Sequence, residues 1–137
     1  MKITATRYHD ISAGHRVYGH ESKCSHLHGH NYRIHLTVEG VLDSVGRVLD
    51  FSIIKTRFFN WIEDQWDHKF LVYEEDTLAK GLRSTDPLGV VLVPFNPTAE
   101  NMASYLVEKL NSMCETEVKV IECRIEETRK CSATAKL

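Results

Sequence analysis

The chain has few of the features that mark secreted, membrane-spanning or nucleic-acid-binding proteins. It has 137 residues but only four cysteines, with no Cys-x-x-Cys motif, and no apolar run near the roughly 18 residues of a membrane span. Its start, Met1-Lys2-Ile3-Thr4, lacks the apolar run of a signal peptide. The 17 basic and 19 acidic residues give a net charge of −2, which favours no polyanion-binding surface. We therefore expect a cytoplasmic protein with reduced thiols that binds neither a membrane nor a nucleic acid.

The rest of the composition is that of an ordinary folded domain. Hydrophobic residues make up 42% of the chain and charged residues 26%. Four cysteines can formally pair in three ways, but a chain of this length can bury a core without disulfides. We expect a single domain over residues 1–137. The one unusual count is histidine, because six of the eight histidines lie between His9 and His30.

Hydrophobic periodicity predicts an α+β fold. Period-two or short apolar patterns predict strands over 2–9, 31–38, 47–51, 89–94, 118–127 and 130–136. Apolar residues spaced three or four apart predict a helix over 52–66, capped by Ser52, and a second helix that opens at Thr98. The segment 73–88 reads as a polar connection. The order β-β-β-α-β-α-β-β suggests that the apolar stripe of each helix covers a sheet.

The densest chemistry lies in the run Cys24-Ser25-His26-Leu27-His28-Gly29-His30. Residues two apart in an extended chain share a face, so His28 and His30 can direct two imidazoles to one point. His15, just beyond the first strand, is the best candidate for a third ligand, although His26 has the same parity as the pair. Three imidazoles with a fourth position open are typical of catalytic zinc, and imidazole also suits iron, nickel or copper. The alternative is a group of surface histidines in a polar loop.

Cys24, four residues before His28, leaves two possibilities open. It can be a fourth ligand, which would close the site. It can also be a free thiol beside the metal, with its pKa lowered by the nearby positive charge, so that it serves as a base. The spacing does not decide between them.

An ordered set of motifs resembles the 6-pyruvoyl-tetrahydropterin synthase / 6-carboxy-tetrahydropterin synthase family along nearly the whole chain. These are Ser12-Ala13-Gly14-His15, Cys24-x-x-x-His28-Gly29-His30-Asn31-Tyr32, Asp50-Phe51, Trp66-Asp67-His68, Pro97-Thr98-Ala99-Glu100-Asn101 and Glu126-Glu127-Thr128. The resemblance implies the tunnelling fold, a four-stranded antiparallel sheet with two helices on one face. It also implies trimers that join their sheets into a barrel, and two stacked trimers that form a homohexamer. The short strands at 47 and 89 then become edges or extensions of the sheet.

The resemblance also implies a role for each matching residue. The zinc ligands are His15, His28 and His30, the catalytic residues are Cys24, Asp67 and His68, and the substrate-binding residues are Glu127 and Thr98. Asp67 and His68 are neighbours, so a direct hydrogen bond between them requires a turn. Glu127 has separate support because it continues the apolar face of Cys123 and Ile125, and a carboxylate there matches the paired donors of a pterin edge.

The implied substrate is 7,8-dihydroneopterin triphosphate, and the implied enzyme is a zinc-dependent lyase. The short gap between the cysteine and His-Gly-His resembles the bacterial carboxy-forming enzymes of 7-deazaguanine and queuosine synthesis, which release acetaldehyde and triphosphate. The runner-up is a pyruvoyl-forming synthase, which eliminates triphosphate without cleaving a carbon–carbon bond. A rival of another class is a non-catalytic zinc-binding assembly protein on the same fold, although the presence of both Cys24 and His68 argues against it.

Overall fold

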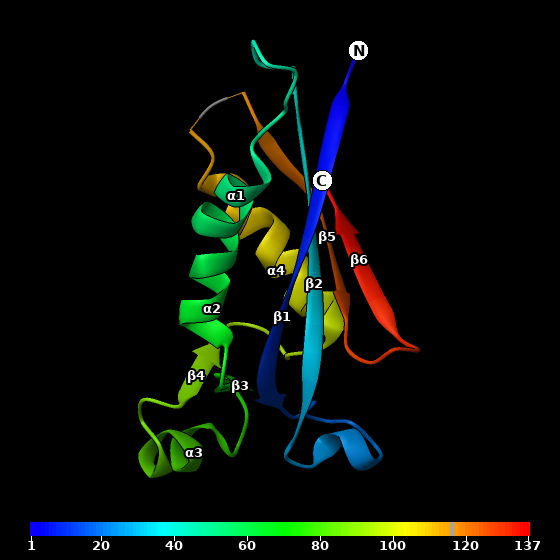
Figure 1. Ribbon diagram of the computed structural model, residues 1–137. Helices are drawn as coiled ribbons and strands as arrows, with labels where there is room; N and C mark the ends of the chain where they lie inside the picture. The colour runs from blue at the N-terminus through cyan, green and yellow to red at the C-terminus, as the bar shows by residue number, and fades with distance from the viewer. Residues whose placement is uncertain (116) are drawn as a thin grey trace.

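The computed structural model describes residues 1–115 and 117–137 as one mixed sheet with helices on one of its faces (Figure 1). The strand order is β4-β3-β1-β2-β5-β6. Four strands form an antiparallel unit, and these are β1 (Ile3–His15), β2 (His28–Gly40), β5 (Lys119–Glu126) and β6 (Ser132–Lys136). Two short strands extend it in parallel beside β1, β3 (Lys69–Tyr73) and β4 (Val90–Val93). The sheet therefore has six strands, and the expected count of four is wrong.

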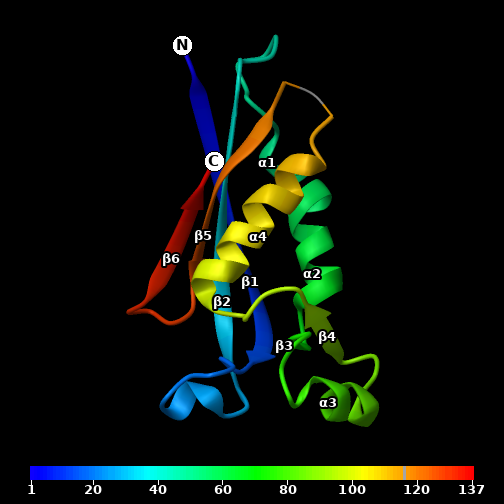
Figure 2. The ribbon, with the colours of Figure 1, turned by 180° about the vertical axis from the view of Figure 1, so that it is seen from behind.

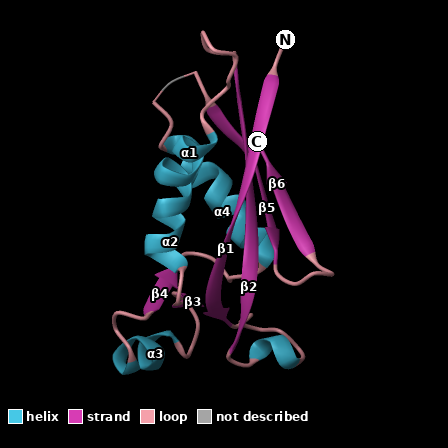
Figure 3. Ribbon diagram, in the orientation of Figure 1, coloured by secondary structure: helices cyan, strands magenta, loops and turns pink. Residues whose placement is uncertain are grey.

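Two long helical segments cover the sheet (Figure 3). The first is continuous from α1 (Phe51–Ile54) through a π-helical turn, η2 (Lys55–Phe59), into α2 (Asn60–Trp66). The second is α4 (Ala99–Ser112), which lies in front of the strands when the molecule is seen from behind (Figure 2). Two short helices, η1 (Lys23–Ser25) and α3 (Ala79–Thr85), lie at the end of the molecule where β1 ends and β2 begins. No helix of the described residues is long and apolar enough to cross a membrane.

The core lies between the helices and one face of the sheet. Alternation along β2 buries Tyr32, Ile34 and Leu36, while α4 buries Met102 and Leu106 against them. The alternate residues of β1, β2 and β5, such as Asp10, Arg33 and Glu126, lie on the opposite, helix-free face. There Arg33 pairs with Asp10, and His35 bonds Glu126. The period-two pattern of β2 is thus confirmed, with its apolar set turned toward the helices.

The predicted strand over 47–51 is wrong. The carboxylate of Asp50 accepts the backbone N–H of Ser52 at 2.8 Å and so caps a helix that begins at Phe51. The helix over 52–66 is confirmed, but its cap is Asp50 rather than Ser52. The Asp50 carboxylate stabilises the first turn of the helix, and this local stabilisation outweighs the strand tendency of the short apolar run before it.

Three further boundaries differ from expectation. The polar connection over 73–88 contains α3, and the preceding residues 69–73 form β3, a strand the periodicity did not reveal. β1 continues to His15 instead of ending at His9, because every residue from Ile3 to His15 pairs with β2.

The cap of the second long helix is confirmed, since the hydroxyl of Thr98 accepts the N–H of Asn101 at 3.1 Å.

Candidate metal centre and active site

The three predicted histidine ligands meet where β1 ends and β2 begins. The antiparallel register places His15 opposite His28 and Ala13 opposite His30, so the three side chains share the helix-covered face. The ring centroids are 4.6 Å apart for His15 and His28, 5.2 Å for His15 and His30, and 4.9 Å for His28 and His30. One ring nitrogen from each lies within 4.8 Å of the other two. The geometry is that of a possible three-histidine metal site.

In His15 and His28, a hydrogen bond at Nδ1 leaves Nε2 available to bind a metal. Nδ1 of His15 donates to the carbonyl of Pro97 at 2.6 Å, and Nδ1 of His28 donates to the carbonyl of His26 at 2.7 Å. Backbone carbonyls can only accept, so both bonds fix the tautomer in which Nε2 carries a lone pair. Nε2 of His15 is buried and has no hydrogen-bond partner among the described residues. This donor set fits a zinc ion.

Burial favours the neutral, metal-binding form of His15 and His30. The side chain of His15 is 1% exposed, and burial lowers its pKa. Burial also lowers the pKa of His30, although the carboxylate of Glu127 acts in the opposite direction. His26 contributes its carbonyl to the site, and its ring is not part of the described cluster.

Two glycines let the ligand strands approach each other closely. Gly14 and Gly29 are directly opposite in the register, one beside His15 and the other between His28 and His30. A Cβ atom on Gly29 would lie 3.0 Å from the carbonyl oxygen of Ala13, and one on Gly14 would meet the ring of Phe70. The close approach explains why the sequence between the ligands is glycine.

Asp67 and His68 form the predicted pair, by means of the turn that their adjacency requires. The backbone of His68 has a positive φ of 58°, and its Nδ1 lies 2.9 Å from Oδ2 of Asp67. Ser12 holds both residues, since its N–H donates to Oδ1 of Asp67 at 2.9 Å and its carbonyl accepts the N–H of His68 at 2.7 Å. Burial acts to raise the pKa of Asp67, but these hydrogen bonds hold it below its usual value. The side chain of His68 is 81% exposed.

Glu127 lies at the edge of the histidine cluster. Its Oε1 is 3.5 Å from Nε2 of His15 and 3.8 Å from Nε2 of His30. The neighbouring Glu126 faces away and bonds His35 on the helix-free side at 2.7 Å. The contrast agrees with the parity argument that singled out Glu127.

Two hollows surround these residues. The larger, about 790 Å³, is lined by Asp67, His68 and Glu127 among others. The second, about 640 Å³, is lined by His28 and His30 and shares Ser12, Asn31 and His68 with the first. The larger hollow is also lined by Asp10, Arg33 and Glu126 of the helix-free face, and the two hollows meet at the residues that they share.

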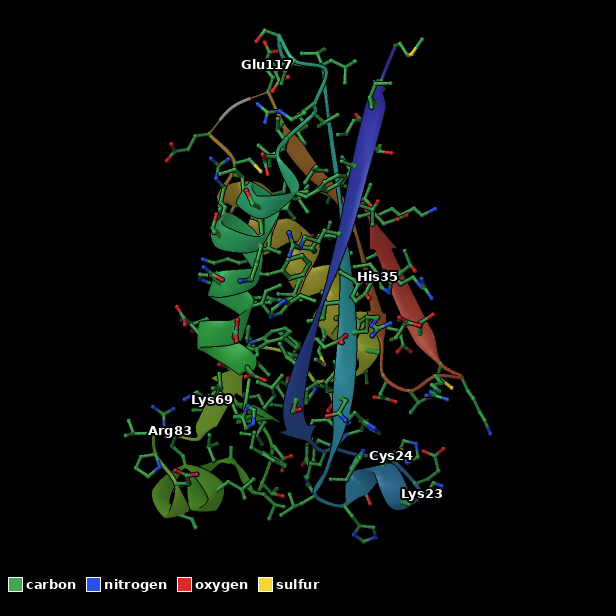
Figure 4. The ribbon with its side chains drawn as sticks, in the orientation of Figure 1. Lys23, Cys24, His35, Lys69, Arg83 and Glu117 are labelled. Atoms are coloured by element: carbon green, nitrogen blue, oxygen red, sulfur yellow. The ribbon has the colours of Figure 1, made fainter. Side chains whose placement is uncertain are left out.

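Cys24 and Thr98 are not members of the histidine cluster of the described residues. Cys24 is on η1, in the loop that joins the His15 and His28 ends of the two strands (Figure 4). Its sulfur is not part of the three-residue cluster found among the described residues. Thr98 follows Pro97, the residue that orients His15, and its hydroxyl caps α4. The sequence did not reveal that the Ser12 backbone positions Asp67 and His68 or that the Pro97 carbonyl orients His15, because any residue type can form a backbone hydrogen bond.

The family model described as 6-pyruvoyl tetrahydropterin synthase matches residues 4–136, which is almost the whole chain. The chain belongs to this family. A relative from Rickettsia typhi named 6-carboxy-5,6,7,8-tetrahydropterin synthase is 32% identical over 133 residues, which cover 94% of this chain and 96% of that protein. A relative from Halobacterium salinarum named probable 6-carboxy-5,6,7,8-tetrahydropterin synthase is 36% identical and covers 86% of this chain and 76% of its own.

Solved structures show the same fold. An uncharacterized protein from Wolinella succinogenes superimposes with a TM-score of 0.87 at 26% identity and covers 99% of this chain and 98% of its own. The 6-pyruvoyl tetrahydropterin synthase of Caenorhabditis elegans gives a TM-score of 0.72 at 27% identity and covers 100% and 96%. The α+β fold of this chain is therefore that of the 6-pyruvoyl tetrahydropterin synthase family.

Proposed function

We propose that the protein is a zinc-dependent 6-carboxy-5,6,7,8-tetrahydropterin synthase. It converts 7,8-dihydroneopterin triphosphate to 6-carboxytetrahydropterin, releases acetaldehyde and triphosphate, and serves 7-deazaguanine and queuosine synthesis. The observation that carries this proposal is the cluster of His15, His28 and His30 on a chain whose relatives bear that name.

The histidine cluster holds the zinc ion. When bound, zinc supplies a Lewis acid that polarises the hydroxyl oxygens of the substrate side chain. His15 and His28 are already fixed as Nε2 donors by their carbonyl partners. The three histidines would hold the zinc ion, and three protein ligands are typical of zinc sites that act on a substrate.

Cys24 and His68 carry the proton transfers. The Cys24 thiolate removes a proton from the substrate side chain, and His68 exchanges a second one through Nε2. Asp67 holds the tautomer of His68 by accepting from Nδ1. Ser12 fixes Asp67 in turn, so the pair is oriented before a substrate arrives.

Glu127 binds the aminopyrimidine edge of the pterin, and Thr98 contacts the ring. A carboxylate accepts two parallel N–H groups in the geometry that a pterin offers. The larger hollow, which Glu127 lines, has room for a bicyclic ring.

The functional assembly is a homohexamer built from two trimers. Within one chain, β4 and β6 each pair on one side only, so the sheet has two open edges. Open edges invite pairing with another chain. Trimers that join these edges would close the sheets into a barrel lined by the polar, helix-free face.

The decisive experiment is incubation of the zinc-loaded protein with 7,8-dihydroneopterin triphosphate, with product masses and acetaldehyde as readouts. The proposal expects 6-carboxytetrahydropterin and one acetaldehyde per turnover. A 6-pyruvoyl product without acetaldehyde would favour the second candidate, 6-pyruvoyl tetrahydropterin synthase, which the likeness to the Caenorhabditis elegans enzyme supports. No turnover of any kind would leave a non-catalytic zinc protein.

A further inference from the structure

A buried ion pair ties the end of β1 to the connection between β3 and α3. The carboxylate of Asp76 is fully buried, and its two oxygens accept from Nε and Nη2 of Arg16 at 2.7 and 2.8 Å. One of these oxygens also accepts the N–H of Leu78 at 2.8 Å, next to α3. A bidentate bond of this kind fixes the plane of the guanidinium.

The third nitrogen of the same guanidinium reaches the loop that carries Cys24. Nη1 of Arg16 donates to the carbonyl of Ser25 at 3.0 Å. The backbone N–H of Val17 donates to the carbonyl of Cys24 at 2.8 Å. Two consecutive carbonyls of η1 are thus held by the two residues that directly follow His15. Because η1 contains no buried residue, these bonds rather than packing determine where it lies.

Both members of the pair are charged. The hydrogen bonds that Arg16 donates to the Asp76 carboxylate raise the pKa of Arg16. Burial acts to raise the pKa of Asp76, but the bonds from Arg16 and Leu78 hold it below its ordinary value. Removing one charge would leave the other buried without a partner, so the two side chains act as a unit.

We infer that Asp76 is a positioning residue that, through Arg16, holds in place the η1 backbone that carries Cys24. The inference rests on the proposed function, in which Cys24 transfers a proton. It gives the connection between β3 and α3 a part in catalysis through the backbone of η1. In Figure 4, Cys24 lies at the same end of the molecule as Lys69 and Arg83, whereas Glu117 lies at the other end.

The first test compares turnover of the zinc-loaded full chain in two variants. Asp76→Asn removes the bidentate charge pair, whereas Arg16→Lys keeps a cation for Asp76 but cannot also reach the Ser25 carbonyl. Both should lower kcat about 10- to 100-fold, the scale of a misplaced reactive group, while zinc content and KM stay near wild type. Asp43→Asn is the matched control, because Asp43 also pairs an arginine and accepts backbone N–H groups but lies in the loop after β2. It should leave kcat unchanged.

The second test needs no turnover. Alkylation of Cys24 by iodoacetamide, followed by peptide mass spectrometry, should be several-fold faster in Asp76→Asn and Arg16→Lys than in wild type and Asp43→Asn. Unchanged alkylation in both variants overturns the inference, even if kcat falls together with zinc content or stability. An inactive wild type with the expected alkylation pattern would end the proposed function while the Asp76–Arg16–Cys24 link stands.

Discussion

The side chain at position 24 decides between two kinds of metal site. If Cys24 is a base rather than a ligand, Cys24→Ala leaves three imidazoles on the zinc. Zinc content should then stay near wild type, while turnover falls by about 10²–10⁴, the usual effect of losing a general base. His28→Ala, which removes a ligand, should lose the zinc. Zinc stoichiometry and turnover measured on both variants test the assignment, and wild-type turnover in Cys24→Ala contradicts it.

Asp76 also makes a prediction about acid stability. Its pKa lies below the ordinary value of 3.8 in the folded chain, so its ionised form stabilises the fold above that value and the contribution disappears as the pH falls through the folded pKa. Stability of the wild type should therefore fall more steeply than that of Asp76→Asn below about pH 5. Urea unfolding at a series of pH values measures the two slopes. Parallel slopes would mean that Asp76 is not paired in solution.

Some of the candidate site could be predicted at the level of single residues. Histidines two apart in an extended chain share a face, so the parity of His28 and His30 indicated that their rings could meet, although it did not exclude His26. The contribution of Arg16 and Asp76 could not be predicted, because the pair joins residues 60 positions apart and neither belongs to a periodic pattern. The φ of 58° at His68 was likewise unpredictable, although the need for a turn there was clear.

At the scale of strands and helices, the ligand-bearing ends of β1 and β2 depend on the two opposed glycines. Gly29→Ala should cost about 1–3 kcal/mol of unfolding free energy, because its Cβ would press on the Ala13 carbonyl. Gly81→Ala is the control, since a Cβ there meets nothing within 4 Å and lies in α3. It should be neutral or stabilising by up to about 1 kcal/mol. Denaturant unfolding of both variants measures the two changes in unfolding free energy. Equal stability of Gly29→Ala and Gly81→Ala would contradict the close approach of the strands.

The cap of α4 gives a prediction that is independent of catalysis. Thr98→Ala removes the hydroxyl that accepts the N–H of Asn101 and should cost about 1 kcal/mol. Thr98→Ser keeps the acceptor and should retain most of the stability. Thermal unfolding compares the two, and an equal loss in both would mean that the threonine methyl, and not the cap, contributes the energy.

Periodicity predicted the long elements well and the short ones poorly. The stripes of α4 and β2 were visible because each repeats over many residues. Residues 10–14, Asp-Ile-Ser-Ala-Gly, have weak strand propensity and form the end of β1 only because β2 pairs with them. The short strand β3 pairs with β1, which lies far away in the sequence, and the short helix α3 buries only Ala79, so neither has a periodic pattern long enough to reveal it.

For the whole molecule, the open sheet edges predict the state of assembly. We expect a hexamer of about six times 15.7 kDa in solution. Light scattering at micromolar concentration measures the mass directly. A monomer under those conditions would contradict the proposed barrel, and a trimer would contradict only the stacking of two rings.

The left-handed turn at His68 has a consequence for how this chain evolves. A non-glycine residue in that conformation costs the fold roughly 1–2 kcal/mol, which glycine would recover. A laboratory selection for thermostability alone should therefore enrich His68→Gly and lose the imidazole with it. Relatives that have histidine at this position accept the lower stability. Histidine there therefore indicates selection for the chemistry of the imidazole rather than for folding.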